Sequence, residues 1–250
     1  MVSSLKLRGI TDDPFIDPTQ YRSIVGALQY ATITRPEISF SVNKVCQFMH
    51  NPQNSHWQAV KRILRYLKGT LDHGLHFTSS PSLSLFAFSD ADWGSDPDDR
   101  RSTTGWCVYL GNNLISWSSK KQAVVARSSI EAEYRGVANV VSEVVWVQSL
   151  LSELMISIQG IPRIFCDNMS TVLLSANHIL HSWSKHVELD LFFVRERVAR
   201  REIEVQHISA AEQTADIMTK VVSSSNFLVC RDKLRLVDSN KLSSRGDVRI

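Results

Sequence analysis

The sequence is poor in cysteine and has no long apolar segment, and each absence argues against a class of protein. The cysteines lie far apart, without a Cys-x-x-Cys pair or a cluster with histidine, which argues against a disulfide framework and against a cysteine-ligated zinc site. The N-terminal residues MVSSLKLRGITDDPF lack an apolar segment of signal-peptide length, and no later segment approaches a membrane span. We therefore expect an intracellular protein, cytoplasmic or nuclear, that is not secreted and has no membrane partner.

A strong excess of charge of one sign is also missing. The 250 residues contain 28 Lys and Arg and 25 Asp and Glu, which gives a formal net charge of +3. A slightly basic chain permits a polyanionic partner without indicating one. With 43% hydrophobic residues, the chain is long enough to bury a core in one or two domains.

The residue pattern divides the chain into regions. Residues 1–17 have the composition of a linker, residues 18–79 are predicted to be helical, residues 81–220 mix strands and helices, and residues 221–250 are a weakly patterned tail that we expect to be loosely structured.

The helical region is predicted to contain helices over 18–31, 38–49 and 55–69. The last helix has a basic face, and two interpretations of it stay open: a solvated surface, which is favoured, and a contact with the backbone of a nucleic acid. The basic residues are Lys61, Arg62, Arg65 and Lys68.

The mixed region begins with three strand-like segments. Residues 83–90, LSLFAFSD, are apolar on both faces, as a central strand is. Residues 105–111 and 114–119 follow, with a hairpin at Gly111–Asn113 and a third strand that is expected to extend through 121–129. These segments predict an antiparallel meander.

The rest of this region alternates helices with strands, which implies parallel pairing. We expect helices over 130–154, 170–179, 186–201 and 210–220, and strands over 161–168 and 202–208. The predicted fold class is therefore α/β, a mixed sheet with an antiparallel meander and parallel strands, flanked by helices and preceded by a small helical region.

Two aspartates end strands of this sheet. Asp90 shares a strand face with Phe86 and Phe88, so its side chain is expected on the core-facing side, and Asp167 ends the strand 161–168. Taken alone, Asp90 is explained as an aspartate that starts a turn, and Asp167 as the N-cap of the helix that follows it. If the strands are neighbours, however, the two carboxylates meet at one rim of the sheet, where like charges require a proton or a cation.

The helix that follows the meander offers two glutamates. Ser128 and Glu131 fit a capping box, and Glu131 stands four residues before Arg135, so Glu131 already has a structural role. Glu133 instead begins an apolar stripe that continues through Val137, where an unneutralised carboxylate is costly. We therefore predict that Glu133, and not Glu131, joins the aspartates.

Two further residues are candidates for the same rim. Asp216 lies in the last predicted helix and His207 ends the strand before it. A helix-dipole or surface charge is the commoner role for Asp216, and a structural role is the commoner one for His207.

The aspartates after Asp90 are expected to form a solvated turn. Residues 96–99 belong to this turn, and residues 100–103 after it are either a polar turn or contacts to a nucleic-acid backbone, two interpretations of equal weight.

Several motifs together carry a resemblance to a known family. They are SDADW (89–93), DDRRSTTG (98–105), ISWSSKKQ (115–122), RSSIEAEYR (127–135), CDN (166–168), KHVELDLFFVRE (185–196) and ADIMTK (215–220). Through them, residues 83–220 resemble the ribonuclease H domain of copia-type long-terminal-repeat retrotransposon Pol polyproteins, and residues 21–77 resemble the reverse transcriptase thumb and connection of the same polyproteins.

The resemblance implies a ribonuclease H-like fold and a set of metal ligands formed by Asp90, Glu133, Asp167 and Asp216, with His207 as a further catalytic residue. It implies two Mg²⁺ or Mn²⁺ ions about 4 Å apart that bridge the scissile phosphate, with Asp90 as the bridging ligand.

The implied activity is endonucleolytic hydrolysis of the RNA strand of RNA–DNA hybrids during reverse transcription, selected through the 2′-hydroxyls. The implied partners are the hybrid, its backbone, and the palm and fingers of a polyprotein. No YVDD-like stretch occurs, so polymerase activity is not expected. The last motif continues as TKVV where the family usually has TKPL, and the alternative is a catalytically inactive, truncated retroelement remnant that only binds nucleic acid.

Overall fold

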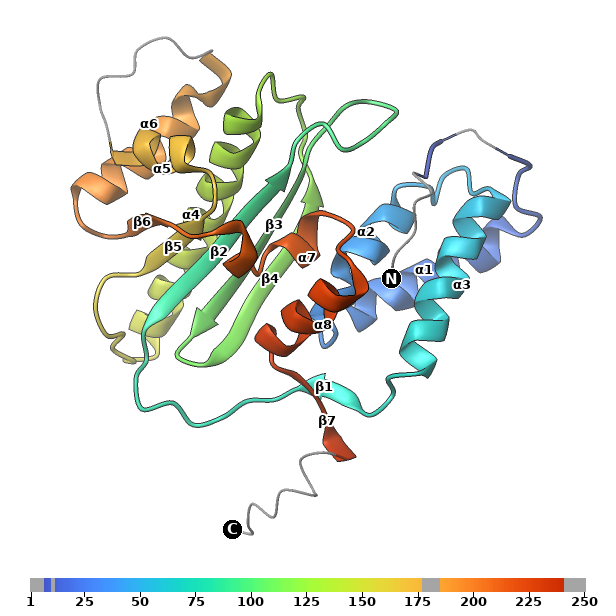
Figure 1. Ribbon diagram of the computed structural model, residues 1–250, viewed down its shortest axis with the longest axis horizontal. Helices are drawn as coiled ribbons and strands as arrows, with labels where there is room; N and C mark the ends of the chain where they lie inside the picture. The colour runs from blue at the N-terminus through green and yellow to red at the C-terminus, as the bar shows by residue number, and fades with distance from the viewer. Residues whose placement is uncertain (1–6, 10–11, 177–184, 241–250) are drawn as a thin grey trace. The chain divides into compact units, whose positions relative to one another are not determined.

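The chain forms two compact units, shown in a computed structural model that describes residues 7–9, 12–176 and 185–240 (Figure 1). The first unit comprises the chain up to His76 together with the residues from Val221 onward, and the second runs from Phe77 to Lys220. In the described part of the chain, no helix has both the length and the apolar character needed to cross a bilayer.

The N-terminal part of the first unit contains three α-helices, as the sequence predicts. They are α1 (Pro18–Ala31), α2 (Ser39–Cys46), which follows a 3₁₀ turn at Pro36–Ile38, and α3 (Asn54–Lys68). Asp17 caps α1 by accepting a hydrogen bond from the Gln20 amide, and Pro18 suits the first turn because its missing N–H has no partner there. Their apolar faces enclose one core, formed by Phe15, Tyr21, Val25, Leu28, Ile38, Val42, Val45, Val60 and Ile63.

The region after residue 220 differs from the loose tail that was expected. It contains α8 (Ser224–Lys233) and strand β7 (Leu236–Asp238), and β7 pairs antiparallel with β1 (His73–Leu75). The Phe227 ring meets Tyr66 of α3 edge-on, with ring centroids 5.6 Å apart. The prediction failed because three-residue strands are too short to show a periodicity, and their pairing spans more than 160 residues of sequence. Residues 241–250 of the expected tail lie outside the described residues.

The second unit contains a five-stranded mixed sheet in the order β4-β3-β2-β5-β6. The strands are β2 (Leu85–Asp92), β3 (Thr103–Leu110), β4 (Asn113–Lys121), β5 (Arg163–Cys166) and β6 (Glu204–His207). The first three pair antiparallel, whereas β2 with β5 and β5 with β6 pair parallel. This order confirms the mixed sheet of the predicted ribonuclease H-like fold and places β2 at its centre.

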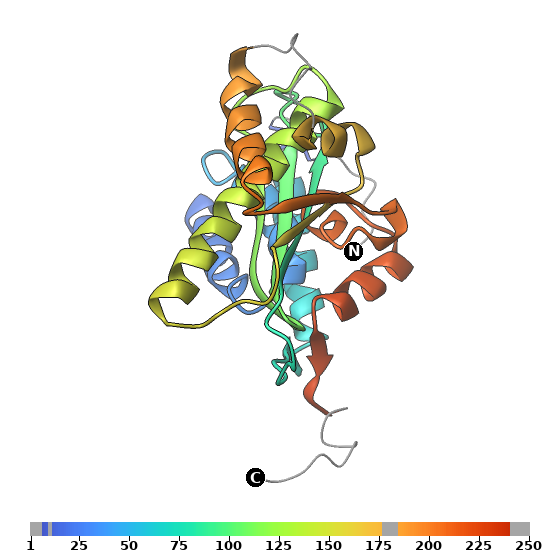
Figure 2. The ribbon, with the colours of Figure 1, turned by 90° about the vertical axis from the view of Figure 1, so that its left-hand side faces the viewer.

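Helices flank this sheet on both faces. They are α4 (Ser129–Glu153), α5 (Met169–Ala176) and α6 (Lys185–Ala199), followed by a 3₁₀ turn (Ala210–Glu212) and the short helix α7 (Asp216–Thr219). With the sheet seen nearly edge on, α4 and α6 lie on one side of it (Figure 2). Helix α7 packs on the opposite face, where a Cβ at Gly105 of β3 would lie 2.5 Å from the Met218 Cβ.

The main core lies between the sheet and α4. The apolar stripe of α4 is buried in it together with residues of β2, β5 and α6. The members from α4 include Val137, Val140, Val144, Val147 and Leu151, which is the stripe that the sequence predicts.

Two predicted elements of this unit were wrong in extent. The third strand ends at Lys121, because the Gln122 side chain donates to Thr104 Oγ1 and to the Ala132 carbonyl and so turns the chain toward α4. The helix expected over 210–220 is broken at Gln213, whose backbone is extended. Residues 177–179 of another expected helix lie outside the described part of the chain.

Candidate active site

The central strand β2 carries Asp90 near its C-terminal end, two residues before its last residue. Asp90 is 2% exposed and lies opposite Gly105 of β3. It shares a face with Phe86 and Phe88, as expected, but that face is not the one that packs on α4. The α4 face is formed by the alternate residues such as Ala87, so the predicted core-facing side was wrong. A strand that is apolar on both faces does not reveal which face receives the helix.

Helix α7 covers the face of the sheet that bears Asp90. The Thr219 hydroxyl donates a hydrogen bond to Asp90 Oδ2, and the Lys220 ammonium lies 3.6 Å from the same oxygen. Asp216, at the first position of α7, pairs with Lys220 at 2.8 Å. Asp216 is partly buried beside Asp90 rather than an isolated surface charge.

Helix α4 brings Glu133 to this rim of the sheet. Glu133 is 8% exposed, and the Cys166 thiol donates to its Oε2 over 4.0 Å. Glu131 is occupied elsewhere, because its carboxylate accepts from the Arg127 amide at 2.8 Å and from Arg135 at 2.9 Å. Ser128 caps the helix by accepting from the Glu131 amide, which is half of the predicted capping box. The cap and the ion pair thus set the helical phase that turns Glu133 inward.

The ends of β5 and β6 supply Asp167 and His207. Asp167 follows β5 directly, and the alternative role of N-cap is taken by Asn168, whose side chain accepts from the Thr171 amide at 3.1 Å. His207 is exposed, and its Nε2 lies 3.1 Å from the Asp167 carbonyl oxygen. The side chain of Gln213 links β2 to the end of β5, because it donates hydrogen bonds to the Ser89 carbonyl and to Asp167 Oδ1.

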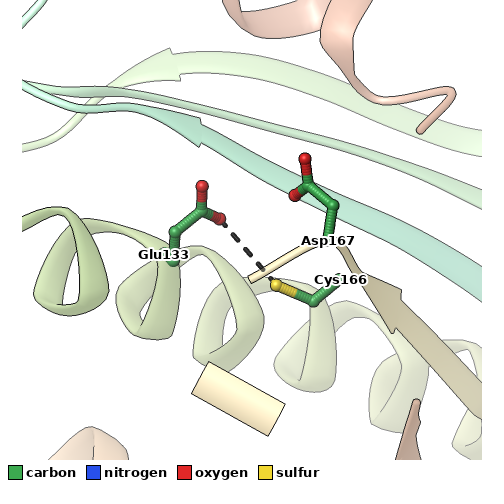
Figure 3. Close-up of side chains that lie close together, drawn as sticks. All are labelled: Glu133, Cys166 and Asp167. Carbon is green, nitrogen blue, oxygen red and sulfur yellow. Dashed lines mark hydrogen bonds between the residues drawn. The ribbon is translucent and has the colours of Figure 1, made fainter. Parts of the chain in front are cut away.

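The carboxylates assemble into two overlapping groups, each with its ligand atoms within 4.8 Å of one another. One group contains Asp90, Asp167 and Asp216, and the other contains Glu133, Cys166 and Asp167. Figure 3 shows the second group, with Glu133 on its helix pointing toward Asp167 and Cys166. Asp167 therefore belongs to both groups and Asp90 to the first, and the bridging role that the resemblance implies for Asp90 stays a prediction.

The burial of these acids makes their negative charge costly. Burial, reinforced by the charges of Asp90 and Asp167, raises the pKa of Glu133 to about 9. Burial also raises the pKa of Asp90 to about 6, although Lys220 and the Thr219 hydroxyl oppose the shift. Burial alone would lower the pKa of Lys220, but the neighbouring carboxylates outweigh it and the net shift is upward. The site as a whole thus attracts positive charge.

The donor set fits a hard divalent cation. The donors are carboxylate oxygens, which suit Mg²⁺ or Mn²⁺. Cys166 adds a soft donor to the second group, and burial raises the pKa of its thiol, which keeps it protonated at neutral pH.

The loop after β2 differs from the solvated turn that was expected. Asp96 is buried, accepts from the amides of Asp98 and Asp99, and pairs with Lys121 at 2.8 Å. The Ser102 and Thr103 side chains are buried as well, which removes them as candidates for contact with a nucleic-acid backbone. Of the four residues 100–103, Arg100 and Arg101 are exposed and stay candidates for contact with a nucleic-acid backbone.

Sequence reasoning missed four residues that touch the predicted acids: Cys166, Gln213, Thr219 and Lys220. Only Lys220 had a local signal, since it stands four residues after Asp216, the spacing of a helical ion pair.

Comparisons with known proteins give close relatives by sequence. The chain is 50% identical over 227 residues to the "Retrovirus-related Pol polyprotein from transposon RE2" of Arabidopsis thaliana, and 51% identical over 227 residues to that from transposon RE1. Each alignment covers 91% of this chain and 16% of the relative, so the chain spans about one sixth of the length of these relatives. No protein-family model matches the chain.

Solved structures resemble the chain more distantly. A ribonuclease H1, LC11-RNase H1 in complex with an RNA/DNA hybrid, has 11% identity and a TM-score of 0.42, covering 54% of this chain and 94% of its own. The foamy viral protease-reverse transcriptase in complex with an RNA/DNA hybrid has 10% identity and a TM-score of 0.48, covering 86% of this chain and 27% of its own.

Proposed function

Because the chain belongs to the retrovirus-related Pol polyproteins of transposons, as a C-terminal part of them, we propose that it is a ribonuclease that hydrolyses the RNA strand of RNA–DNA hybrids during reverse transcription. The observation that carries the proposal is the convergence of Asp90, Glu133, Asp167 and Asp216 from four separate elements. Buried carboxylates are unfavourable next to one another, and a bound cation is the common reason for such an arrangement.

The proposed metal ligands are the carboxylates of the two groups described above. Asp90, Asp167 and Asp216 would hold one divalent cation, and Glu133 with Asp167 would hold a second. Bound Mg²⁺ or Mn²⁺ would supply an activated water and neutralise charge on the phosphate.

Other residues would orient these ligands and handle protons. Thr219 holds one oxygen of Asp90, and Gln213 holds one oxygen of Asp167. His207 is exposed beside Asp167, where its imidazole can exchange a proton with a substrate oxygen and with solvent. The rest of the polyprotein, with its palm and fingers, is the proposed protein partner, and Arg100 and Arg101 are proposed contacts to the substrate backbone.

Cleavage of a labelled RNA–DNA hybrid, with RNA–RNA and DNA–DNA duplexes as comparison substrates, tests the proposal. We expect wild type to cleave the RNA strand of the hybrid only when Mg²⁺ or Mn²⁺ is added. Asp90→Asn and Glu133→Gln should each lower the rate at least ~100-fold, since both remove a charged ligand.

Glu131→Gln is the matched control. It makes the same chemical change on the same helix two residues earlier, at a carboxylate that pairs with Arg135. It should lower the stability but retain most of the cleavage rate. Salt-sensitive binding of the hybrid by a wild-type protein that cleaves nothing with either metal would overturn the enzyme proposal and favour a binding remnant.

A further inference from the structure

Among the residues that the structure describes, Lys220 supplies the ammonium that contacts the carboxylates of the candidate site. Its ammonium lies 2.8 Å from Asp216 Oδ1 and 3.6 Å from Asp90 Oδ2. Both carboxylates belong, with Asp167, to the group whose ligand atoms lie within 4.8 Å of one another. The ammonium therefore contacts two of the three carboxylates that a divalent cation in this group would need.

Joint occupancy of these carboxylates by both cations is unfavourable. Mg²⁺ binds carboxylate oxygens at about 2.1 Å, so an ammonium 2.8 Å from the same oxygen would face a doubly charged ion at close range. Repulsion between like charges is strong where water is scarce, and Asp90 is 2% exposed.

Lys220 can leave without disrupting the fold. It follows the last residue of α7, its backbone is extended, and its side chain is 39% exposed. The flexible stem of a lysine allows its ammonium to move into solvent while the backbone stays in place. Thr219 is buried and keeps α7 attached to Asp90.

We propose that Lys220 is the counter-cation of the metal-free site and competes with the divalent cation for Asp90 and Asp216. This inference rests on the proposed function, because it assumes that the carboxylates bind metal. Its consequence is that Lys220 sets the metal concentration at which the site fills, so removal of its charge strengthens metal binding.

Calorimetric titration of the full chain with MgCl₂ or MnCl₂, after treatment with EDTA and removal of the chelator, tests the competition without any nucleic acid. Lys220→Met should bind the metal three- to tenfold more tightly than wild type, the range expected for loss of a partly exposed, hydrogen-bonded ion pair. Its metal-free form should unfold at a lower temperature than metal-free wild type. Lys220→Arg retains the charge and should keep the wild-type Kd within about twofold.

Lys121→Met is the matched control for removal of a lysine charge. Lys121 also lies 2.8 Å from each of two aspartates, Asp96 and Asp99, but neither belongs to the carboxylate groups of the site. This variant should lose thermal stability and leave the Kd for metal unchanged.

The outcomes separate the inference from the function that it assumes. Equal or weaker metal binding by Lys220→Met, beside measurable binding by wild type, overturns the competition and leaves the ribonuclease proposal standing. Failure of both folded proteins to bind Mg²⁺ or Mn²⁺ at millimolar concentrations overturns the metal site, and the proposed function with it.

Discussion

The metal-free protein is expected to lose stability as the pH rises, and replacement of Glu133 by glutamine is expected to prevent this loss. The pKa of Glu133 is raised from 4.5 to about 9, mainly by burial. Between these two values the folded protein binds a proton at Glu133 that the unfolded chain has already lost. Rising pH therefore favours the unfolded chain, and the stabilisation present below pH 4.5 is lost by about pH 9.

The magnitude follows from linkage. One proton of difference changes the free energy of unfolding by about 1.4 kcal/mol per pH unit, so Glu133 alone would lower it by about 3 kcal/mol between pH 6.5 and 8.5. The pKa of Asp90 is raised to about 6, so Asp90 changes the free energy of unfolding mainly below pH 6.5. Glutamine has nearly the same shape and does not titrate, so Glu133→Gln should be nearly insensitive to pH in this range.

Urea unfolding in EDTA at pH 6.5, 7.5 and 8.5 measures the effect. Glu131→Gln is the control, and it should keep the wild-type slope because Glu133 is still present. Excess Mg²⁺ should flatten the wild-type slope, since a bound cation replaces the proton as the source of positive charge. If Glu133→Gln loses stability with pH as steeply as wild type, burial of Glu133 is not the cause and the reasoning fails.

Four further substitutions, one of them a control, test the fold and the surroundings of the site. Gly105→Ala should cost about 1–3 kcal/mol in urea unfolding and impair cleavage, because the new Cβ would lie 2.5 Å from the Met218 Cβ; a stability equal to wild type would contradict the close packing of α7. Ile164→Ala should cost about 2–5 kcal/mol, since Ile164 is fully buried, whereas Leu189→Ala, at a side chain 80% exposed, should stay within about 0.5 kcal/mol. His207→Ala should lower kcat about 100-fold and leave the melting temperature and hybrid binding unchanged, and an unchanged kcat would remove His207 from the proposed mechanism.

Local patterns in the sequence predicted several elements correctly. The caps and apolar spacings predicted α1 and α3 closely, and Gly111 marked the β3–β4 turn, where its φ is +56°. The phase of α4 was predictable because the roles of Ser128 and Glu131 are local, within one helical turn of each other. Such features are encoded over a few residues, which is the range that a periodicity can report.

Features that depend on distant pairings were not predictable in this way. The packing of α8 against Tyr66 and the pairing of β7 with β1 join the last described residues to a segment far earlier in the chain. The break at Gln213 depends on its hydrogen bonds to Ser89 and Asp167, which no local propensity contains. Tertiary contacts override helix propensity at such positions.

The sequence by itself determined which acids lie near the C-terminal ends of β2 and β5 and which glutamate turns inward on α4, although β2 runs two residues past the predicted end at Asp90. Alternation along a strand and phase along a helix are local properties. Only the tertiary structure decided which face of β2 receives α4, since that strand is apolar on both faces. Only the tertiary structure also brought the Lys220 ammonium to within 3.6 Å of Asp90 Oδ2, across 130 residues of sequence, because that contact depends on the packing of α7 against the sheet.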